Sequence, residues 1–291
     1  MNNVSPVKAI GFGFSSFFKN FFFFLYVFFV GVVILSSGFL VSLIIGLPFL
    51  LPLFMMGGRL FSFFVSISGK TDPQVIALQL KSFVDVLISG GILSIVGLVF
   101  GIILVLILNK MTFDYVVFGL TRISIDIYDK GRSSIGKLFS PFAMFFKYFI
   151  STLLYNSILW VSIFFVFLLG FFLAALMGAC VGPLGGAIGA CLGVLGVIPF
   201  IYWVIKFWFY SYLIADKNFG TIDAFKKSYN IKGGFKAVFL TNLLFFILFA
   251  FLGMVYYIPH IGGILNLVLS VMTWPIFILS GAFLYRHLTG E

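Results

Sequence analysis

Residues 148–205 read YFISTLLYNSILWVSIFFVFLLGFFLAALMGACVGPLGGAIGACLGVLGVIPFIYWVI and contain no Asp, Glu, Lys or Arg. These 58 residues are apolar apart from a few hydroxyl groups and the single amide of Asn156. Water-soluble domains do not carry uncharged runs of this length, and a helix that spans the hydrocarbon core of a bilayer needs about 20 apolar residues. The stretch therefore predicts two membrane crossings joined by a turn.

Three further charge-free runs, at 20–58, 86–109 and 237–285, extend this prediction to the rest of the chain. Their lengths of 39, 24 and 49 residues allow one, one and two crossings. The runs lack the alternation of polar and apolar residues that membrane β-barrels show. We therefore expect an all-α integral membrane protein with six transmembrane helices, arranged as three hairpins. The surplus of the first run leaves room for a seventh crossing, but Pro48 and Pro52 are predicted to break the helix there.

The basic residues indicate how six crossings are oriented. With a cytosolic N-terminus, the cytosolic side carries fifteen basic residues and the other side three. The three are Arg59, Lys70 and Lys81. Because cytoplasmic loops are enriched in Lys and Arg, this asymmetry predicts a bacterial cytoplasmic (inner) membrane protein with both termini in the cytosol. The formal net charge of +10 follows from the same asymmetry, so it is not an indication of nucleic-acid binding.

The chain shows signs of an internal repeat within one polytopic domain, 1–291. Shifting residues 124–135 forward by 87 positions aligns Asp129-Lys130 with Asp216-Lys217, and five of the twelve positions are identical. A Phe-Lys pair also precedes each odd-numbered crossing. These matches predict repeat units at about 5–128, 129–215 and 216–291, although a chance match is the alternative. Unit one carries an outer insertion at about 48–90, in which a surface helix is expected after Asp72-Pro73.

Basic segments between the crossings are candidates for amphipathic helices in the lipid headgroup layer. Thr221 is a suitable N-cap for a helix that begins at Ile222, with Phe225 and Tyr229 on the same apolar face. The candidate contacts to anionic lipid are Arg132, Lys137, Lys147, Lys226, Lys227, Lys232 and Lys236. The alternative is that these charges only orient the chain in the membrane.

Small and amide residues within the uncharged runs suggest how the helices pack. Glycines at close to helical spacing favour close helix approach, because association in lipid depends on packing. The candidates are Gly178, Gly182, Gly186, Gly189 and Gly193. A glycine-lined substrate path is the alternative. Three amides, Asn156, Asn242 and Asn266, are expected to be buried. They would form interhelical hydrogen bonds or, alternatively, a polar patch for a lipid headgroup.

Catalytic patterns are not found in the sequence. The eight acidic residues fall at predicted helix ends, loops or the tail, and the two histidines, His260 and His287, are expected on opposite sides of the membrane. The sequence has no nucleophile elbow, zinc-protease motif or phosphate-binding loop. We therefore predict no enzymatic activity, no catalytic or metal-binding residues and no cofactor.

A family resemblance is carried by ADKNFGTIDAFKKS at 215–228, together with residues 233–239 and 282–286. These segments resemble a broad group of uncharacterised bacterial six-helix integral membrane proteins. Relatives of that group form the membrane domain of some glycerophosphodiester phosphodiesterases. The resemblance implies a polytopic membrane fold and no activity, since the phosphodiesterase chemistry lies in a separate domain. The insertion at 48–90 departs from the compact hairpin of such proteins.

Two function classes follow from these observations. The first is a non-enzymatic membrane protein that packs against membrane lipids, anionic ones included, or against partner membrane proteins. The alternative is a transporter or permease for a lipidic or hydrophobic solute. The alternative requires a cavity at mid-bilayer that is lined by Asn156, Asn242 or Tyr155, whereas a solid apolar core there would exclude it.

Overall fold

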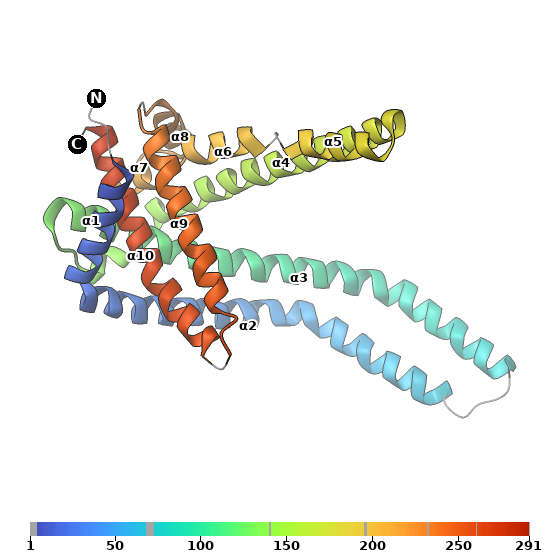
Figure 1. The fold of residues 1–291 in the computed structure, drawn as a ribbon. Coiled ribbons are helices and arrows are strands. Elements are labelled where there is room, and N and C mark those ends of the chain that lie inside the picture. The colour runs from blue at the N-terminus through green and yellow to red at the C-terminus, as the bar shows by residue number, and fades with distance from the viewer. Residues whose placement is uncertain are drawn as a thin grey trace. The chain divides into compact units, whose positions relative to one another are not determined.

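The computed structural model describes residues 5–67, 73–139, 141–194, 197–231, 233–259 and 261–290. Within these residues the chain is helical and contains no strand, which confirms the predicted all-α class. The elements are α1 (Pro6–Lys19), α2 (Phe21–Ile67), α3 (Pro73–Lys130), the 3₁₀ turn η1 (Ile135–Leu138), α4 (Phe142–Val181), α5 (Pro183–Val194), α6 (Val197–Lys206), α7 (Tyr210–Lys217), α8 (Thr221–Asn230), α9 (Phe235–Val255) and α10 (Gly262–Thr289) (Figure 1).

Five of the described helices contain a stretch long and apolar enough to cross a membrane. These stretches are Phe21–Phe49, Val96–Lys130, Phe142–Val181, Phe235–Val255 and Gly262–Thr289. The chain therefore has the helices of a multi-pass membrane protein. The segment expected to form a further crossing is divided into α5 and α6, of 12 and 10 residues. Both pack along α4.

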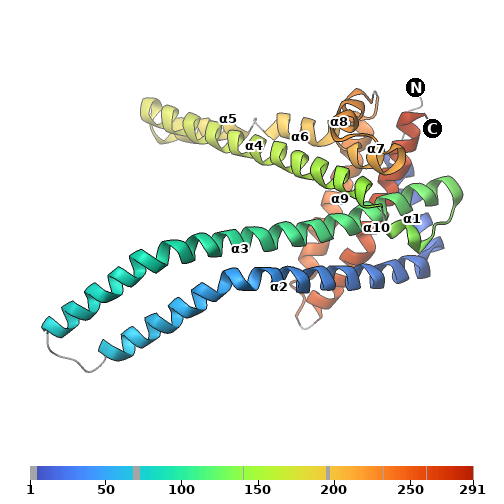
Figure 2. The same ribbon diagram turned by 180° about the vertical axis from the view of Figure 1, so that it is seen from behind.

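The chain forms two compact units, and residues 30–113 make up one of them. This unit is a hairpin of α2 and α3 (Figure 2). Its helices approach closely at Gly38, whose Cα faces Thr112, and at Gly101, which faces Phe49. The amide of Asn109 donates a 3.0 Å hydrogen bond to the Ser42 hydroxyl between the two helices.

The prediction that Pro48 and Pro52 break the first helix is wrong. α2 continues through both residues to Ile67, and α3 begins at Pro73, so the expected surface helix is the first part of α3. A proline inside a helix costs about 3 kcal/mol. In hydrocarbon, however, a broken helix would leave backbone groups without any water to bond, and membrane helices therefore tolerate proline. Residues 68–72 lie outside the described residues.

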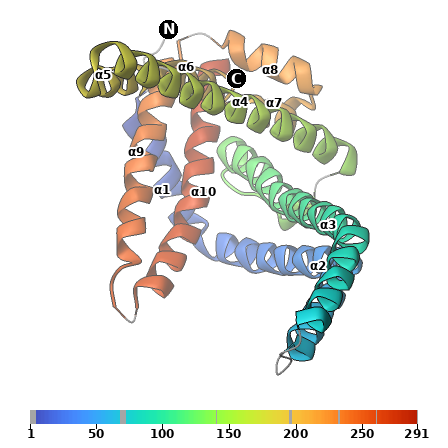
Figure 3. The same ribbon diagram turned by 90° about the vertical axis from the view of Figure 1, so that its right-hand side faces the viewer.

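The second unit holds residues 1–29 and 114–291. α1 packs on α9 and α10, and Gly13 of α1 lies against Ser280 and the Ile276 carbonyl of α10 (Figure 3). Phe12 of α1 also contacts Phe283 of α10, at a ring-centroid distance of 5.4 Å. As a result, the N-terminal helix lies beside the C-terminal end of the chain (Figure 1).

The basic segment after α7 is helical, with small differences from the sequence prediction. α8 begins at Thr221, and its N-cap is Gly220. The Thr221 hydroxyl instead donates a 3.4 Å hydrogen bond to the carbonyl of Lys147. Phe225 is buried, but Ile222 and Tyr229 are exposed, so the three residues do not share one buried face. α8 ends at Asn230, before Gly233 and Gly234.

Candidate functional site

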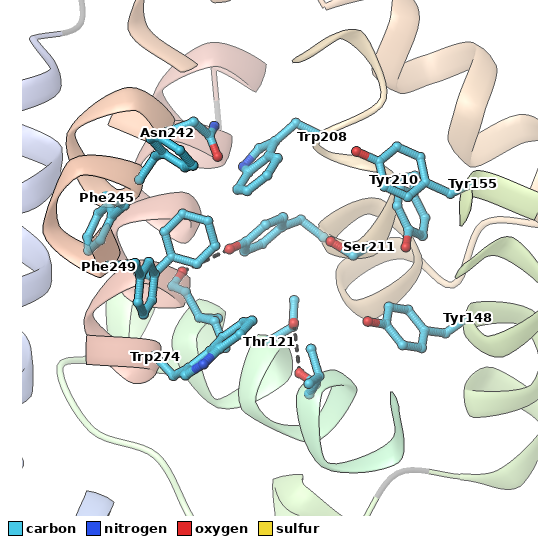
Figure 4. A pocket seen from close by; sticks show the side chains of 15 residues that line it. Thr121, Tyr148, Tyr155, Trp208, Tyr210, Ser211, Asn242, Phe245, Phe249 and Trp274 are labelled. Carbon is cyan, nitrogen blue, oxygen red and sulfur yellow. Dashed lines mark hydrogen bonds between the residues drawn. The ribbon is translucent and has the colours of Figure 1, made fainter. Parts of the chain in front are cut away.

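A cavity of about 520 Å³ lies within the second unit, between α3, α4, α7, α9 and α10 (Figure 4). Ten of the fifteen side chains that line it are aromatic, and those described carry no formal charge. A volume between 300 and 1,000 Å³ with mainly apolar walls is typical of small-molecule sites. The cavity is therefore the candidate functional site.

The aromatic wall results from helical spacing on α9 and α10. Phe245 and Phe249 are four residues apart and so face the same side of α9, while Trp274 and Phe277 are three apart on α10. The rings of Phe245 and Phe277 meet edge to face at a centroid distance of 4.9 Å. Trp208, in the turn between α6 and α7, meets Phe277 in the same way at 5.2 Å. These contacts hold the rings of three elements in place.

The side opposite this wall carries tyrosine hydroxyls, contributed by α4 and α7 (Figure 4). The Tyr210 hydroxyl shares a 3.0 Å hydrogen bond with Thr152, and the Tyr212 hydroxyl donates a 2.9 Å bond to the carbonyl of Ile278. Burial raises the pKa of Tyr210 and of Tyr212 above the ordinary tyrosine value. Both phenols therefore stay protonated at neutral pH and add no charge to the cavity.

One buried polar atom at the cavity has no hydrogen-bond partner among the described residues. The indole Nε1 of Trp208 is buried and makes no such bond. By contrast, the side-chain nitrogen of Asn242, which also lines the cavity, donates a 2.9 Å bond to the carbonyl of Val238. Buried donors in native proteins nearly always have a partner. The Trp208 N–H can therefore donate a hydrogen bond to a ligand without breaking a hydrogen bond of the fold.

The cavity opens beside the apolar surface of α9 and α10. Phe246 and Trp274 both line it, yet they are 70% and 42% exposed. Phe246 lies near the middle of the candidate span Phe235–Val255. The rim therefore lies midway along a candidate membrane span.

A second polar cluster joins the C-terminal ends of α3, α7 and α10. The guanidinium of Arg286 donates a 3.0 Å hydrogen bond from Nε to Asp129 and a 2.8 Å bond from Nη1 to Asp216. The Tyr285 hydroxyl donates a 2.9 Å bond to Asp216 as well. The side chain of Arg286 is only 8% exposed. This cluster ties three helix ends together and does not line the cavity.

The structure places the predicted polar residues as follows. Of the three amides, Asn242 lines the cavity, whereas Asn156 and Asn266 are not among its lining residues. Asn266 donates its amide to the carbonyl of Leu252, between α10 and α9. Tyr155 of α4 does line the cavity, as the transporter alternative requires.

The predicted basic residues do not form one cluster. Arg132, Lys226, Lys227 and Lys236 are exposed, whereas Lys137 and Lys147 are half-buried. Lys137 lies 3.9 Å from the carboxylate of Asp126, and Lys147 donates a 3.1 Å bond to the side chain of Asn218. Lys232 lies outside the described residues.

The predicted small residues meet where α5 folds back on α4. The Cα atom of Gly186 would lie 3.6 Å from a β-carbon at Gly178. A β-carbon at Gly189 would collide with the backbone of Leu173 and Ala174. Gly182 ends α4 at φ +79°, a conformation that favours glycine. The packing of Gly193 lies outside the described side chains.

Neither the aromatic wall nor the role of Arg286 was predicted from the sequence. The spacing of Phe245 with Phe249, and of Trp274 with Phe277, was a signal for the wall, but aromatic residues are so frequent here that it does not stand out. For Arg286 the signal was the alignment of Asp129 with Asp216. In the described part of the chain, no three His, Cys, Asp or Glu side chains gather as metal ligands do.

Comparison of the chain with models of protein families, with curated proteins and with solved structures gives no match. The resemblance of residues 215–228 to six-helix membrane proteins therefore stays a prediction.

Proposed function

We propose that this chain is a non-enzymatic multi-pass membrane protein that binds a lipidic or hydrophobic solute in its aromatic cavity. The observation that carries the proposal is the exposed rim at Phe246, halfway along an apolar candidate span. A solute dissolved in hydrocarbon could enter there without crossing water. The uncharged lining suits such a solute, because an ion would lose its hydration and find no paired charge.

Six crossings in the bacterial cytoplasmic membrane, with both termini in the cytosol, form part of this proposal. α1 packs beside the C-terminal half of α10, so the two ends of the chain belong on the same side of the membrane. Termini on one side require an even number of crossings, whereas five stretches qualify by length and apolarity. The α5–α6 segment, which packs along α4, is the natural sixth crossing.

The proposed repeat is supported by the ends of α3 and α7. Asp129 and Asp216, which the shift of 87 positions aligns, bind the same guanidinium. Two residues further on, Gly131 and Asn218 both adopt positive φ, at +71° and +54°. Their amides bond the carbonyls of Ile127 and Ile214, which are also aligned positions. The two helices thus end by the same local geometry.

A second candidate function, packing against anionic lipid or a partner membrane protein, is favoured by α8. This helix exposes Lys226 and Lys227 next to the exposed apolar side chain of Ile222. Lysine beside an apolar side chain is typical of helices that lie in the headgroup layer. The two functions are compatible, since α8 does not line the cavity.

The cavity proposal is tested by photo-cross-linking in lipid nanodiscs with a long-chain alkyl diazirine. We expect cross-links at Phe246 and Phe249 that excess unlabelled hexadecanol removes, because the cavity holds a limited number of molecules. Cross-links on the exposed face of α4, at Trp160, should persist, since bulk lipid contacts that face.

A matched pair of variants completes this experiment. Ser211→Phe fills the cavity and should abolish the competed cross-links, whereas Ser157→Phe, on an exposed position of α4, should leave them unchanged. Cross-links at Phe249 that hexadecanol cannot remove, or that survive Ser211→Phe, would exclude a solute site.

A further inference from the structure

We infer that the cavity selects a neutral apolar ring that carries a carbonyl group, and that the indole N–H of Trp208 is the donor to that carbonyl. The inference rests on the proposed solute site and names its ligand class. It starts from the one buried polar atom of the described cavity lining that lacks a hydrogen-bond partner. An indole nitrogen can only donate, so its missing partner is an acceptor.

The walls define the rest of the ligand. Edge-to-face contacts such as Trp208 with Phe277 and Phe245 with Phe277 build an aromatic surface on which a flat ring can pack. The described lining carries no formal charge, so a carboxylate or ammonium group would be buried unpaired. A neutral carbonyl satisfies the donor without that cost.

Two other donors at the cavity each make a hydrogen bond within the protein. The hydroxyl of Tyr212 bonds the carbonyl of Ile278, and the amide nitrogen of Asn242 bonds that of Val238. Trp208 is the buried donor of the described lining that lacks a partner, so we expect discrimination between ligands to depend on it. A ring without an acceptor would leave its N–H unsatisfied, and a single hydrogen bond of this kind changes affinity by about three- to tenfold.

The test uses two probes of nearly equal shape, 2-methyl-1,4-naphthoquinone and 2-methylnaphthalene, which differ by two carbonyl groups. Each competes with the alkyl diazirine for cross-linking at Phe249 in nanodiscs, with concentrations corrected for partition into lipid. In the unaltered protein, we expect the quinone to displace the diazirine at a concentration about three- to tenfold lower than the hydrocarbon.

Trp208→Phe removes the donor and keeps an aromatic ring. The quinone should lose its advantage in this variant, while the hydrocarbon competes as before. Trp160→Phe is the matched control, because Trp160 is 71% exposed on α4 and does not line the cavity.

The outcomes separate this inference from the proposal on which it rests. If the two probes compete equally in the unaltered protein, the carbonyl preference is wrong and the solute site stands. An advantage of the quinone that survives Trp208→Phe assigns the donor elsewhere and overturns the role of Trp208. If neither probe competes while hexadecanol still does, the inference is wrong and the solute site stands; if hexadecanol fails as well, both are wrong. Should Trp208→Phe fail to fold, the comparison of the two probes in the unaltered protein still decides the carbonyl preference.

Discussion

At the scale of single residues, Arg286 is the clearest case of one side chain that connects distant parts of the chain. It lies near the end of α10, and its two carboxylate partners lie at the ends of α3 and α7. The Asp216 side chain is 14% exposed and that of Asp129 is 37% exposed. Since water screens the more exposed partner, the bond to Asp216 should contribute more to stability.

This geometry predicts graded effects on the free energy of unfolding. Arg286→Met leaves two carboxylates near each other without a counter-charge and should lower that free energy by about 3 kcal/mol. Asp216→Asn should cost more than Asp129→Asn, for which we expect about 1 kcal/mol or less. Unfolding by a denaturing detergent in mixed micelles measures these changes.

Arg132→Met is the control for this series, because Arg132 is an exposed arginine just after α3. This substitution should change the free energy of unfolding by no more than about 0.5 kcal/mol. Equal stabilities of Arg286→Met and Arg132→Met would show that the guanidinium does not hold the three helix ends together.

The same scale shows what the sequence could and could not predict about the site. That Asn242 and Tyr155 line a cavity could be predicted, because polar groups in an apolar run need hydrogen-bond partners or a polar surrounding. The unsatisfied Trp208 was not predictable, since whether an indole N–H finds a partner depends on backbone carbonyls of other helices. Position along the sequence carries no information about that.

At the scale of elements, the α4–α5 hairpin depends on how closely two helices approach. Gly189→Ala should lower the free energy of unfolding by about 1 to 3 kcal/mol, because the new β-carbon meets the backbone of α4. Gly178→Ala is the matched control: its β-carbon would have Gly186 at 3.6 Å, an ordinary contact. Both changes raise helix propensity alike, so a difference between them measures packing. Similar stabilities of the two variants would contradict the close approach of α5 to α4.

A separate element, α8, predicts a response to lipid charge. A ligand that binds the folded state raises the temperature of unfolding. Phosphatidylglycerol should therefore raise the Tm of the detergent-solubilised protein more than phosphatidylcholine does. Lys226→Gln with Lys227→Gln should reduce that difference, whereas Lys81→Gln, on α3, should not. If both lipids shift the Tm of the unaltered protein equally, the proposed binding of anionic lipid is wrong.

Prediction from sequence was most successful for the existence of long helices and least successful for where they end. Composition identifies a helix that hydrocarbon surrounds, because few other structures satisfy the backbone there. It does not locate the end of α2, since the cost of Pro48 and Pro52 competes with the cost of unpaired backbone groups. Which of these two costs is larger depends on neighbouring helices, and the local sequence does not specify them.

At the scale of the whole molecule, the arrangement of the two chain ends limits the number of crossings. α1 and α10 belong to one compact unit, and the ring of Tyr128 at the end of α3 lies 5.3 Å from Phe12 and 5.9 Å from His287. One aromatic cluster thus contains the beginning of the chain, the end of the chain and the end of α3. Residues in contact with one another must lie on the same side of the membrane.

Cysteine labelling tests this topology. In a background of Cys180→Ser and Cys191→Ser, the substitutions Ser5→Cys and Thr289→Cys should both resist a membrane-impermeant maleimide added to intact cells. Both should react once the membrane is opened. Tyr257→Cys, in the turn between α9 and α10 and 83% exposed, should react in intact cells, because that turn lies one crossing away from the C-terminal end.

Reaction of Ser5→Cys and Thr289→Cys from opposite sides would require an odd number of crossings, and the packing of α1 on α10 would then be incompatible with the membrane. Reaction of both from outside would keep an even number of crossings but reverse the predicted orientation, and α8 would then lie at the outer surface.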